Sequence, residues 1–172
     1  MNIRLALPAD VDDVYRLYDE ARSHLRSQGI FQWPDSYPSL NVVSRDANNE
    51  ELYVFETDGL IAGAVCLNEQ QDEAYASIDW KVPDLCPLVI HRLVVAPKFQ
   101  RKGIARKMMD FSEDLAERNG YASVRLDAYT GHERVGQFYK SRGYICRGQV
   151  RFPERELPFW CFELEVTGNQ AI

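Results

Sequence analysis

The stretch that decides the fold runs from Val89 to Met109 and reads VIHRLVVAPKFQRKGIARKMM. Its first part is apolar and rich in β-branched residues, which predicts a strand over Leu88–Ala96. A short basic turn follows, and the apolar periodicity after it predicts an amphipathic helix from Gly103 to a C-cap at Asn119–Gly120. A buried strand that leads through a turn into a helix is therefore the centre of the predicted fold.

The turn between this strand and this helix suits an anion. The first N–H groups of a helix have no intrahelical acceptors, and the helix dipole is positive at that end. Gly103 lacks a Cβ that would hold a phosphate away, and Ala105 keeps the next turn slim. Positive charge comes from Arg101, Lys102, Arg106 and Lys107. The alternative is a strand–helix connection with a solvated basic cap.

Two other phosphate-binding motifs are excluded. The chain contains no G-x-x-x-x-G-K-[ST] segment, which argues against a P-loop nucleoside triphosphatase. It also contains no G-x-G-x-x-G segment after a strand, which argues against a dinucleotide-binding fold.

The pattern Gln100-x-x-Gly103-x-Ala105 resembles the acyl-CoA pyrophosphate loop of the GNAT acetyltransferase superfamily. A second segment, residues 132–144, reads HERVGQFYKSRGY and is similar to another part of that family's signature. The family commonly has an Asn, a small residue, Phe-Tyr and finally Gly-Phe or Gly-Tyr. Here His132 stands in place of the Asn.

The resemblance implies that acetyl-CoA is the co-substrate, with no metal, and that an amine attacks the acetyl thioester directly in a ternary complex. It implies two parallel strands, Leu88–Ala96 and Ala122–Ala128, that splay apart around the pantetheine arm. The implied cofactor-binding residues are Leu93, Val94, Val95, Gln100, Arg101, Lys102, Gly103, Ile104, Ala105, Arg106, His132 and Phe138. A backbone N–H near Val95 would stabilise the oxyanion.

Two residues are predicted to carry the proton transfers. Tyr139 matches the position at which the family places the general acid that protonates the leaving thiolate. Asp127 is the first candidate for the general base, because related protein N-terminal acetyltransferases carry an acidic residue late on that strand. Asp79 and His91 are alternatives. Each of these residues also has a purely structural interpretation, as a packed ring, a strand-end carboxylate or a core histidine.

The acceptor pocket is expected beneath the Gly/Pro/aromatic loop at Gly29–Tyr37. Its predicted substrate-binding residues are Trp33, Tyr37, Trp80 and His91. Simple packing is the alternative for these aromatic rings. The sequence leaves open whether the acceptor is a small-molecule amine or a peptide amine.

Composition narrows the class of protein. The chain has 172 residues and a formal net charge of −6, which favours one domain over 1–172 and disfavours a general nucleic-acid binder. Neither a signal peptide nor a membrane-spanning run is evident, so a cytoplasmic protein without membrane contact is expected. The four cysteines are widely spaced and indicate free thiols, with no zinc site.

Hydrophobic periodicity predicts an α+β fold. Helices are expected from about Asp10 to Gln28 and over Ser39–Asn48, and an Asp-Gly hairpin joins two apolar runs at residue 58. Ala74–Trp80 alternates and predicts a third antiparallel strand. Phe159–Val166 either pairs across a homodimer or finishes the sheet of the monomer. The expected fold is a GNAT-like mixed, mainly antiparallel central sheet flanked by helices, in the order βααβββαβαββ.

Two rival functions remain on the sequence alone. One is a non-catalytic acyl-CoA-binding or sensing module on the same fold. The other is a scaffold or interaction protein in which the basic loop only solvates a helix end. Tyr139 favours the enzyme, whereas His132 and the uncertain base favour the binding module.

Overall fold

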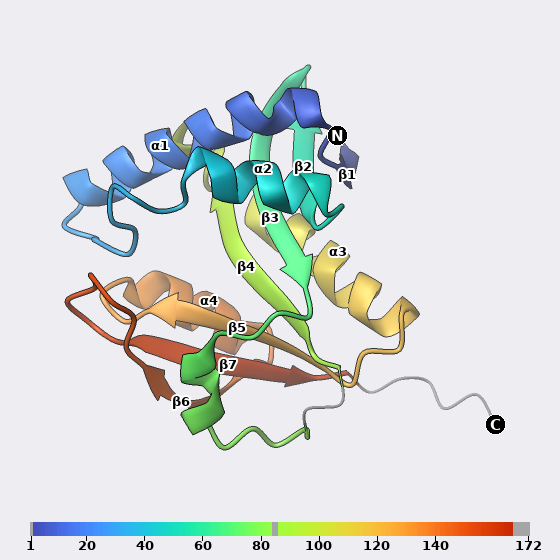
Figure 1. Ribbon diagram of the computed structural model, residues 1–172, viewed down its shortest axis with the longest axis vertical. Helices are drawn as coiled ribbons and strands as arrows, with labels where there is room; N and C mark the ends of the chain where they lie inside the picture. The colour runs from blue at the N-terminus through green and yellow to red at the C-terminus, as the bar shows by residue number, and fades with distance from the viewer. Residues whose placement is uncertain (1, 84–85, 167–172) are drawn as a thin grey trace. The chain divides into compact units, whose positions relative to one another are not determined.

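In a computed structural model of the protein, which describes residues 2–83 and 86–166, seven strands form one sheet in the order β1-β2-β3-β4-β5-β7-β6 (Figure 1). The strands are β1 (Asn2–Leu5), β2 (Leu52–Thr57), β3 (Leu60–Asn68), β4 (Leu88–Val95), β5 (Ser123–Tyr129), β6 (Ile145–Val150) and β7 (Phe159–Glu165). The helices are α1 (Val11–Ser27), α2 (Leu40–Asn48), α3 (Ile104–Arg118) and α4 (Glu133–Ser141). Short 3-10 turns are η1 (Pro8–Asp10), η2 (Glu73–Ser77) and η3 (Pro97–Phe99).

Two compact units divide these elements. The first unit comprises residues 2–67 and 91–111, and the second comprises residues 68–83, 86–90 and 112–166. Strand β4 contributes its last five residues to the first unit and its first three to the second. In the part of the chain with described structure, no helix combines the length and apolar character needed to cross a membrane.

In the first unit, α1 and α2 contact each other and α2 contacts β2 (Figure 1). Side chains of α1 at helical spacing, such as Val14, Leu17 and Tyr18, enter a core shared with β2 and β3. Ser39 caps α2 by accepting a hydrogen bond from the N–H of Val42 at 3.3 Å. Both helices therefore form where the apolar periodicity predicts them.

Strand β3 presents its two faces to different layers. Ala64 belongs to the core with α1 and α2. A Cβ added at its neighbour Gly63 would lie 2.8 Å from Sδ of Met108 and 3.3 Å from Ile104, both on α3. Because successive residues of a strand point to opposite faces, the missing side chain at Gly63 lets α3 approach the sheet closely.

The predicted Asp-Gly hairpin is confirmed. Thr57 pairs with Leu60 across the turn, and the two residues between them, Asp58 and Gly59, have φ values of 52° and 72°. Two successive positive φ angles are the requirement of a type I′ turn, which Asp-Gly meets at low cost.

The second unit is built on β5, β7 and β6. Leu88–Ile90 pair in parallel with Val124–Leu126, whereas β7 pairs antiparallel with β5 on one side and with β6 on the other. Both edges of β7 are thus paired within the chain, so this strand lies inside the sheet of the monomer, with β6 at the edge, and offers no edge to a second copy. Helix α4 packs on β5 and comes close to Trp160 at Gly136.

One sequence prediction is wrong. Ala74–Trp80 is not a strand, because residues 73–77 form the 3-10 turn η2. Asp72 caps this turn by accepting a hydrogen bond from the N–H of Ala74 at 2.9 Å. Such side-chain caps offer the backbone an alternative to a sheet ladder. The aromatic side chains of Tyr75 and Trp80 reach their partners although the segment is not a strand. The predicted order βααβββαβαββ, which does not count Ala74–Trp80 as a strand, matches the observed order of helices and strands.

Candidate functional site

The turn from β4 into α3 has the backbone shape that the sequence predicts. Arg101 and Gly103 have φ values of 60° and 79°, and the first helical bond of α3 runs from the N–H of Lys107 to the carbonyl of Gly103 at 3.1 Å. No atom lies within 4 Å of a Cβ added at Gly103. Glycine is therefore favoured here by its left-handed backbone, and the space above it is open.

The side chains of this turn divide into two groups. Ile104 is buried against β3, so only its backbone N–H is suited to an anion. Lys98 and Lys102 both place their ammonium groups over the Phe99 ring, at 5.3 and 5.1 Å from its centroid. These cation–π contacts gather positive charge beside the positive end of the α3 dipole. The exposed members of the turn are Gln100, Arg101, Lys102 and Arg106.

Strand β4 is distorted just before Leu93. Arg92 has a φ of 54°, a conformation that is rare for a residue with a long side chain. Its carbonyl accepts a hydrogen bond from the Tyr18 hydroxyl at 2.8 Å, and its guanidinium donates to the Tyr37 hydroxyl at 2.7 Å and forms an ion pair with Asp46. These partners hold an irregular backbone immediately before Leu93–Val95, the segment predicted to bind the cofactor arm.

The aromatic loop between α1 and α2 is fixed by arginines. Trp33 is 8% exposed and packs edge-on against Tyr18, with ring centroids 5.5 Å apart. Arg26 donates to the Trp33 carbonyl at 3.2 Å, and Arg22 donates to the Tyr37 carbonyl at 3.3 Å. Trp33 is thus a core residue of the first unit, while Tyr37 is half-buried and held by β4.

Asp127 lies on β5 in the second unit and is bound by a tyrosine that the sequence analysis did not single out. The hydroxyl of Tyr75 donates to Oδ2 of Asp127 at 2.7 Å. The Tyr75 side chain is 3% exposed. Burial, and then the negative charge of Asp127, raise the pKa of Tyr75 well above its usual value, so this phenol keeps its proton.

Trp80 and Arg125 form the neighbouring contact. The guanidinium of Arg125 lies 4.4 Å from the centroid of the Trp80 ring, and the indole N–H donates to the Tyr75 carbonyl at 3.2 Å. One face of Trp80 is therefore covered by the protein itself. Asp79, the alternative base on the same segment, is exposed, and His91 is half-buried on β4.

Tyr139 is 6% exposed on α4 and is surrounded by the rings of Phe138, Tyr144 and Phe162. Burial first, and then the charge of Asp127, raise the pKa of Tyr139. The raised pKa keeps this phenol protonated, which is the form that a general acid needs, and also makes it a weaker acid. Asp127 and Tyr139 thus share one electrostatic environment in the second unit.

His132 precedes α4 at its N-cap position but makes no side-chain capping bond. Burial and the nearby charge of Arg134 lower the pKa of His132, so the ring is neutral near pH 7. A neutral imidazole carries one N–H donor, so His132 can donate a hydrogen bond, as can the Asn that it replaces in the family pattern.

The residues that sequence reasoning missed are charged groups in apolar strands. Arg92 interrupts VIHRLVV and Arg125 interrupts SVRLDAY, and each is tied to a segment far away in the chain. The alternation Arg125-x-Asp127 was a usable signal, because residues i and i+2 of a strand face the same side. Tyr75 was concealed by the incorrect strand prediction.

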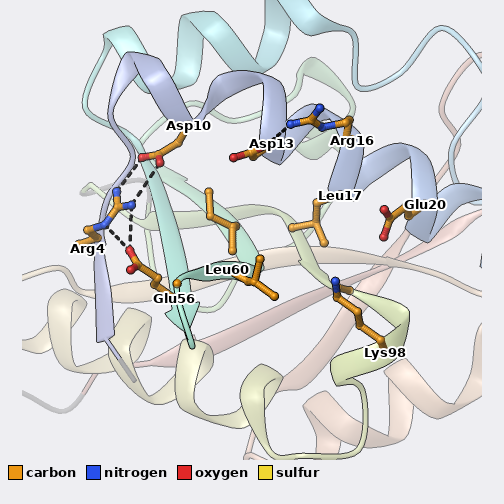
Figure 2. A pocket seen from close by; sticks show the side chains of 12 residues that line it. Arg4, Asp10, Asp13, Arg16, Leu17, Glu20, Glu56, Leu60 and Lys98 are labelled. Atoms are coloured by element: carbon orange, nitrogen blue, oxygen red, sulfur yellow. Dashed lines mark hydrogen bonds and ion pairs between the residues drawn. The ribbon is translucent and has the colours of Figure 1, made fainter.

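Two further features of the first unit lie apart from the predicted residues. Asp46, Glu51 and Cys66 bring potential metal ligands within 4.8 Å of one another. However, Asp46 is paired with Arg92, and burial raises the pKa of Cys66 to about 12, which disfavours the thiolate that a metal would need. A groove of about 290 Å³ lies beside η3. Arg4 bridges Asp10 and Glu56 there, and Lys98 also lines the groove (Figure 2).

Comparison with known proteins decides the family. The model of the acetyltransferase (GNAT) family matches residues 11–144. The chain belongs to the GNAT acetyltransferase family. The resemblance found in the sequence is thereby confirmed, and this GNAT protein is an acetyltransferase.

Individual relatives of this GNAT protein are distant. It is 21% identical to YesJ, an uncharacterised N-acetyltransferase of Bacillus subtilis (strain 168), over 83% of this chain and 81% of YesJ. A GNAT acetyltransferase structure from Streptococcus agalactiae 2603 is 24% identical, with a TM-score of 0.81 over 95% of this chain and 94% of that one. The structure of yncA from Salmonella typhimurium with its cofactor acetyl-CoA is 19% identical, with a TM-score of 0.74 over 100% of this chain and 97% of that one. These structures confirm the predicted fold class.

Proposed function

We propose that the protein transfers the acetyl group of acetyl-CoA to a primary amine by direct attack in a ternary complex. The observation that carries this proposal is the turn into α3. Gly103 adopts a φ of 79° at the start of a helix, among exposed basic side chains, which is a built site for a pyrophosphate. The acetyl-CoA in the yncA structure supports the same co-substrate here.

The cofactor-binding residues divide into three roles. The backbone and cationic side chains of Gln100–Arg106 would hold the pyrophosphate. The backbone of Leu93–Val95 would bind the pantetheine arm, and an N–H near Val95 would stabilise the oxyanion. His132 and Phe138, in front of and within α4, would contact the remainder of the arm.

Asp127 and Tyr139 would carry the proton transfers. A lysine-like amine with a pKa of about 10.4 is neutral in only about one molecule in 2,500 at pH 7, so a base that removes its proton raises the rate. Asp127 is the carboxylate suited to that role. The protonated phenol of Tyr139 would protonate the departing thiolate, a modest contribution because a thiol with a pKa of about 8.5 already leaves well as an anion.

The acceptor is proposed to be a small-molecule or peptide amine that binds near Tyr37, His91 and Trp80, with Trp33 supporting the loop from the core. The proposed compartment is the cytoplasm, in keeping with the free thiols of all four cysteines.

The first test is release of the coenzyme A thiol from acetyl-CoA against a panel of polyamines, amino acids, aminoglycosides and short peptides. Amine-dependent release above hydrolysis is expected for one class. Release that no amine stimulates, although acetyl-CoA binds, would refute the transferase proposal and leave a binding module.

A matched pair of variants tests the cofactor site. Gly103 and Gly120 cap the two ends of α3 with φ values of 79° and 74°, and a Cβ added to either meets nothing within 4 Å. Gly103→Trp is expected to abolish acetyl-CoA binding in calorimetry, while Gly120→Trp retains it at a similar cost in stability. Unchanged affinity in folded Gly103→Trp protein contradicts the assignment of the loop.

A further inference from the structure

A segment without strands crosses β5 and β7 in the second unit. We name residues 69–83 the strap. Arg125 donates to the Gln71 side chain and to the Val82 carbonyl, both at 2.6 Å. The carboxylate of Glu163 accepts the backbone N–H groups of Lys81 and Val82 at 2.9 and 3.3 Å. Two buried charges on neighbouring strands therefore fix the end of the strap.

These anchors also fix a tyrosine inside the strap. Trp80 stacks on Arg125, donates its indole N–H to the Tyr75 carbonyl, and packs on the Tyr75 ring with centroids 5.3 Å apart. The Tyr75 backbone lies in η2, whose first turn Asp72 caps. The ring, backbone and hydroxyl of Tyr75 thus have defined partners, and the partner of the hydroxyl is Asp127.

In the pair of Tyr75 and Asp127, the phenol is the hydrogen-bond donor and the carboxylate is the acceptor. The phenol keeps its proton, so it donates to the carboxylate. A hydrogen bond donated to a carboxylate favours its ionised form, and a charge-assisted bond is stronger than one between neutral groups. An engaged oxygen also fixes the plane of the carboxylate, which otherwise rotates about a soft side-chain torsion.

We propose that Tyr75 is a positioning residue that orients the Asp127 carboxylate and keeps it ionised for proton removal from the acceptor amine. The inference rests on the proposed function, because it assigns Asp127 the role of base. It adds the strap to the catalytic apparatus, since the contacts of Trp80, Arg125 and Glu163 serve to place a single hydroxyl.

Two titratable groups near Asp127 stay neutral over the pH range in which carboxylates titrate. Tyr139 on α4 has a raised pKa, and burial together with the charge of Asp127 raises the pKa of Cys161 on β7 to about 12. Both groups are neutral between pH 5 and 9. The remaining carboxylate is that of Asp72, whose charge acts on both Tyr75 and Cys161. Tyr139 and Cys161 therefore do not contribute to the acid side of the rate profile.

The decisive variant is Tyr75→Phe, which removes one hydroxyl and keeps the ring. We expect the acid limb of the kcat/KM profile to move to higher pH by roughly one unit, because the lost bond had favoured the ionised carboxylate. The KM for acetyl-CoA should stay unchanged. The matched control is Tyr121→Phe, which removes another phenol–carboxylate bond of the second unit, to Glu69 at 3.0 Å, and should leave the profile in place.

A second measurement tests the pair without catalysis. At pH 7 the unfolding equilibrium constant should change about tenfold on Tyr75→Phe, but less than twofold when Asp127→Leu has already removed the acceptor. Equal changes in the two backgrounds overturn the pairing. If Tyr75→Phe is active and its kcat/KM profile is unchanged, the positioning role alone is overturned. A wild-type protein without amine-dependent turnover overturns the proposed function, and the catalytic role of Tyr75 with it.

Discussion

The replacement Glu163→Gln should strongly destabilise the second unit. The Glu163 side chain has 0% exposure. Its carboxylate accepts a hydrogen bond from Nε of Arg147 at 2.8 Å and hydrogen bonds from the backbone N–H groups of Lys81 and Val82. It also lies 3.4 Å from Nε of Arg125. One negative charge thus compensates two guanidinium groups and satisfies two backbone donors.

The expected cost follows from this geometry. Glutamine has nearly the same volume, but it removes the charge and turns one acceptor oxygen into an NH₂ group that faces other donors. Removing one partner of a buried ion pair lowers the free energy of unfolding by about 3–5 kcal/mol. The total free energy of unfolding of a typical domain is roughly 5–15 kcal/mol. For a chain of this size that corresponds to a fall in melting temperature of roughly 6–20 °C.

Urea unfolding followed by tryptophan fluorescence measures this cost, and Trp80 reports on the network because it stacks on Arg125. The matched control is Glu165→Gln on the same strand. The Glu165 side chain is 38% exposed and pairs with Lys81 at 2.7 Å and with Arg147 at 3.8 Å. As an exposed pair it should contribute less than about 1 kcal/mol. Equal costs for the two variants would refute the reasoning from burial.

Three further outcomes are expected. Because the lowered pKa of His132 makes the unfolded chain bind its proton more readily, stability should fall as pH drops below about 6.5, and His132→Asn should flatten that fall in melts between pH 7.5 and 5. A colorimetric thiol reagent should label Cys86 and Cys146 quickly in the native protein, and the two buried thiols, whose pKa burial raises to about 12, only on unfolding. Gly63→Ala should cost about 1–3 kcal/mol in urea unfolding, since its Cβ would come within 2.8 Å of a side chain and 3.0 Å of a backbone carbonyl; a neutral result would show that α3 can shift away from β3.

Local signals predicted most of the fold. Helix α2 covers Leu40–Asn48, within one residue of the predicted range Ser39–Asn48, because Ser39 serves as its N-cap. The hairpin at Asp58–Gly59 has a turn type that only a few dipeptides favour. The turn from β4 into α3 could be predicted in the same way, since a strand end, a glycine and a helix start are neighbours in the sequence.

Contacts between distant segments could not be predicted in this way. The apolar pattern of Ala74–Trp80 contains a buried tyrosine and a half-buried tryptophan, and it is indistinguishable from a half-buried strand until Asp127 and Arg125 are seen to be their partners. The same holds for Trp33, whose place in the core depends on Tyr18 of α1. A single sequence gives the residue types of such clusters but not their pairing.

Both units solve the same physical problem with a buried arginine on a central strand. An irregular segment cannot satisfy its own backbone carbonyls, and a guanidinium offers five donors in a planar fork. Arg92 holds the aromatic loop through Tyr37, and Arg125 holds the strap through Gln71 and the Val82 carbonyl. The aromatic residues proposed to contact the acceptor therefore also stabilise the fold. Any change of acceptor preference made at these rings should lower stability as well, so an engineered enzyme would need a compensating mutation elsewhere.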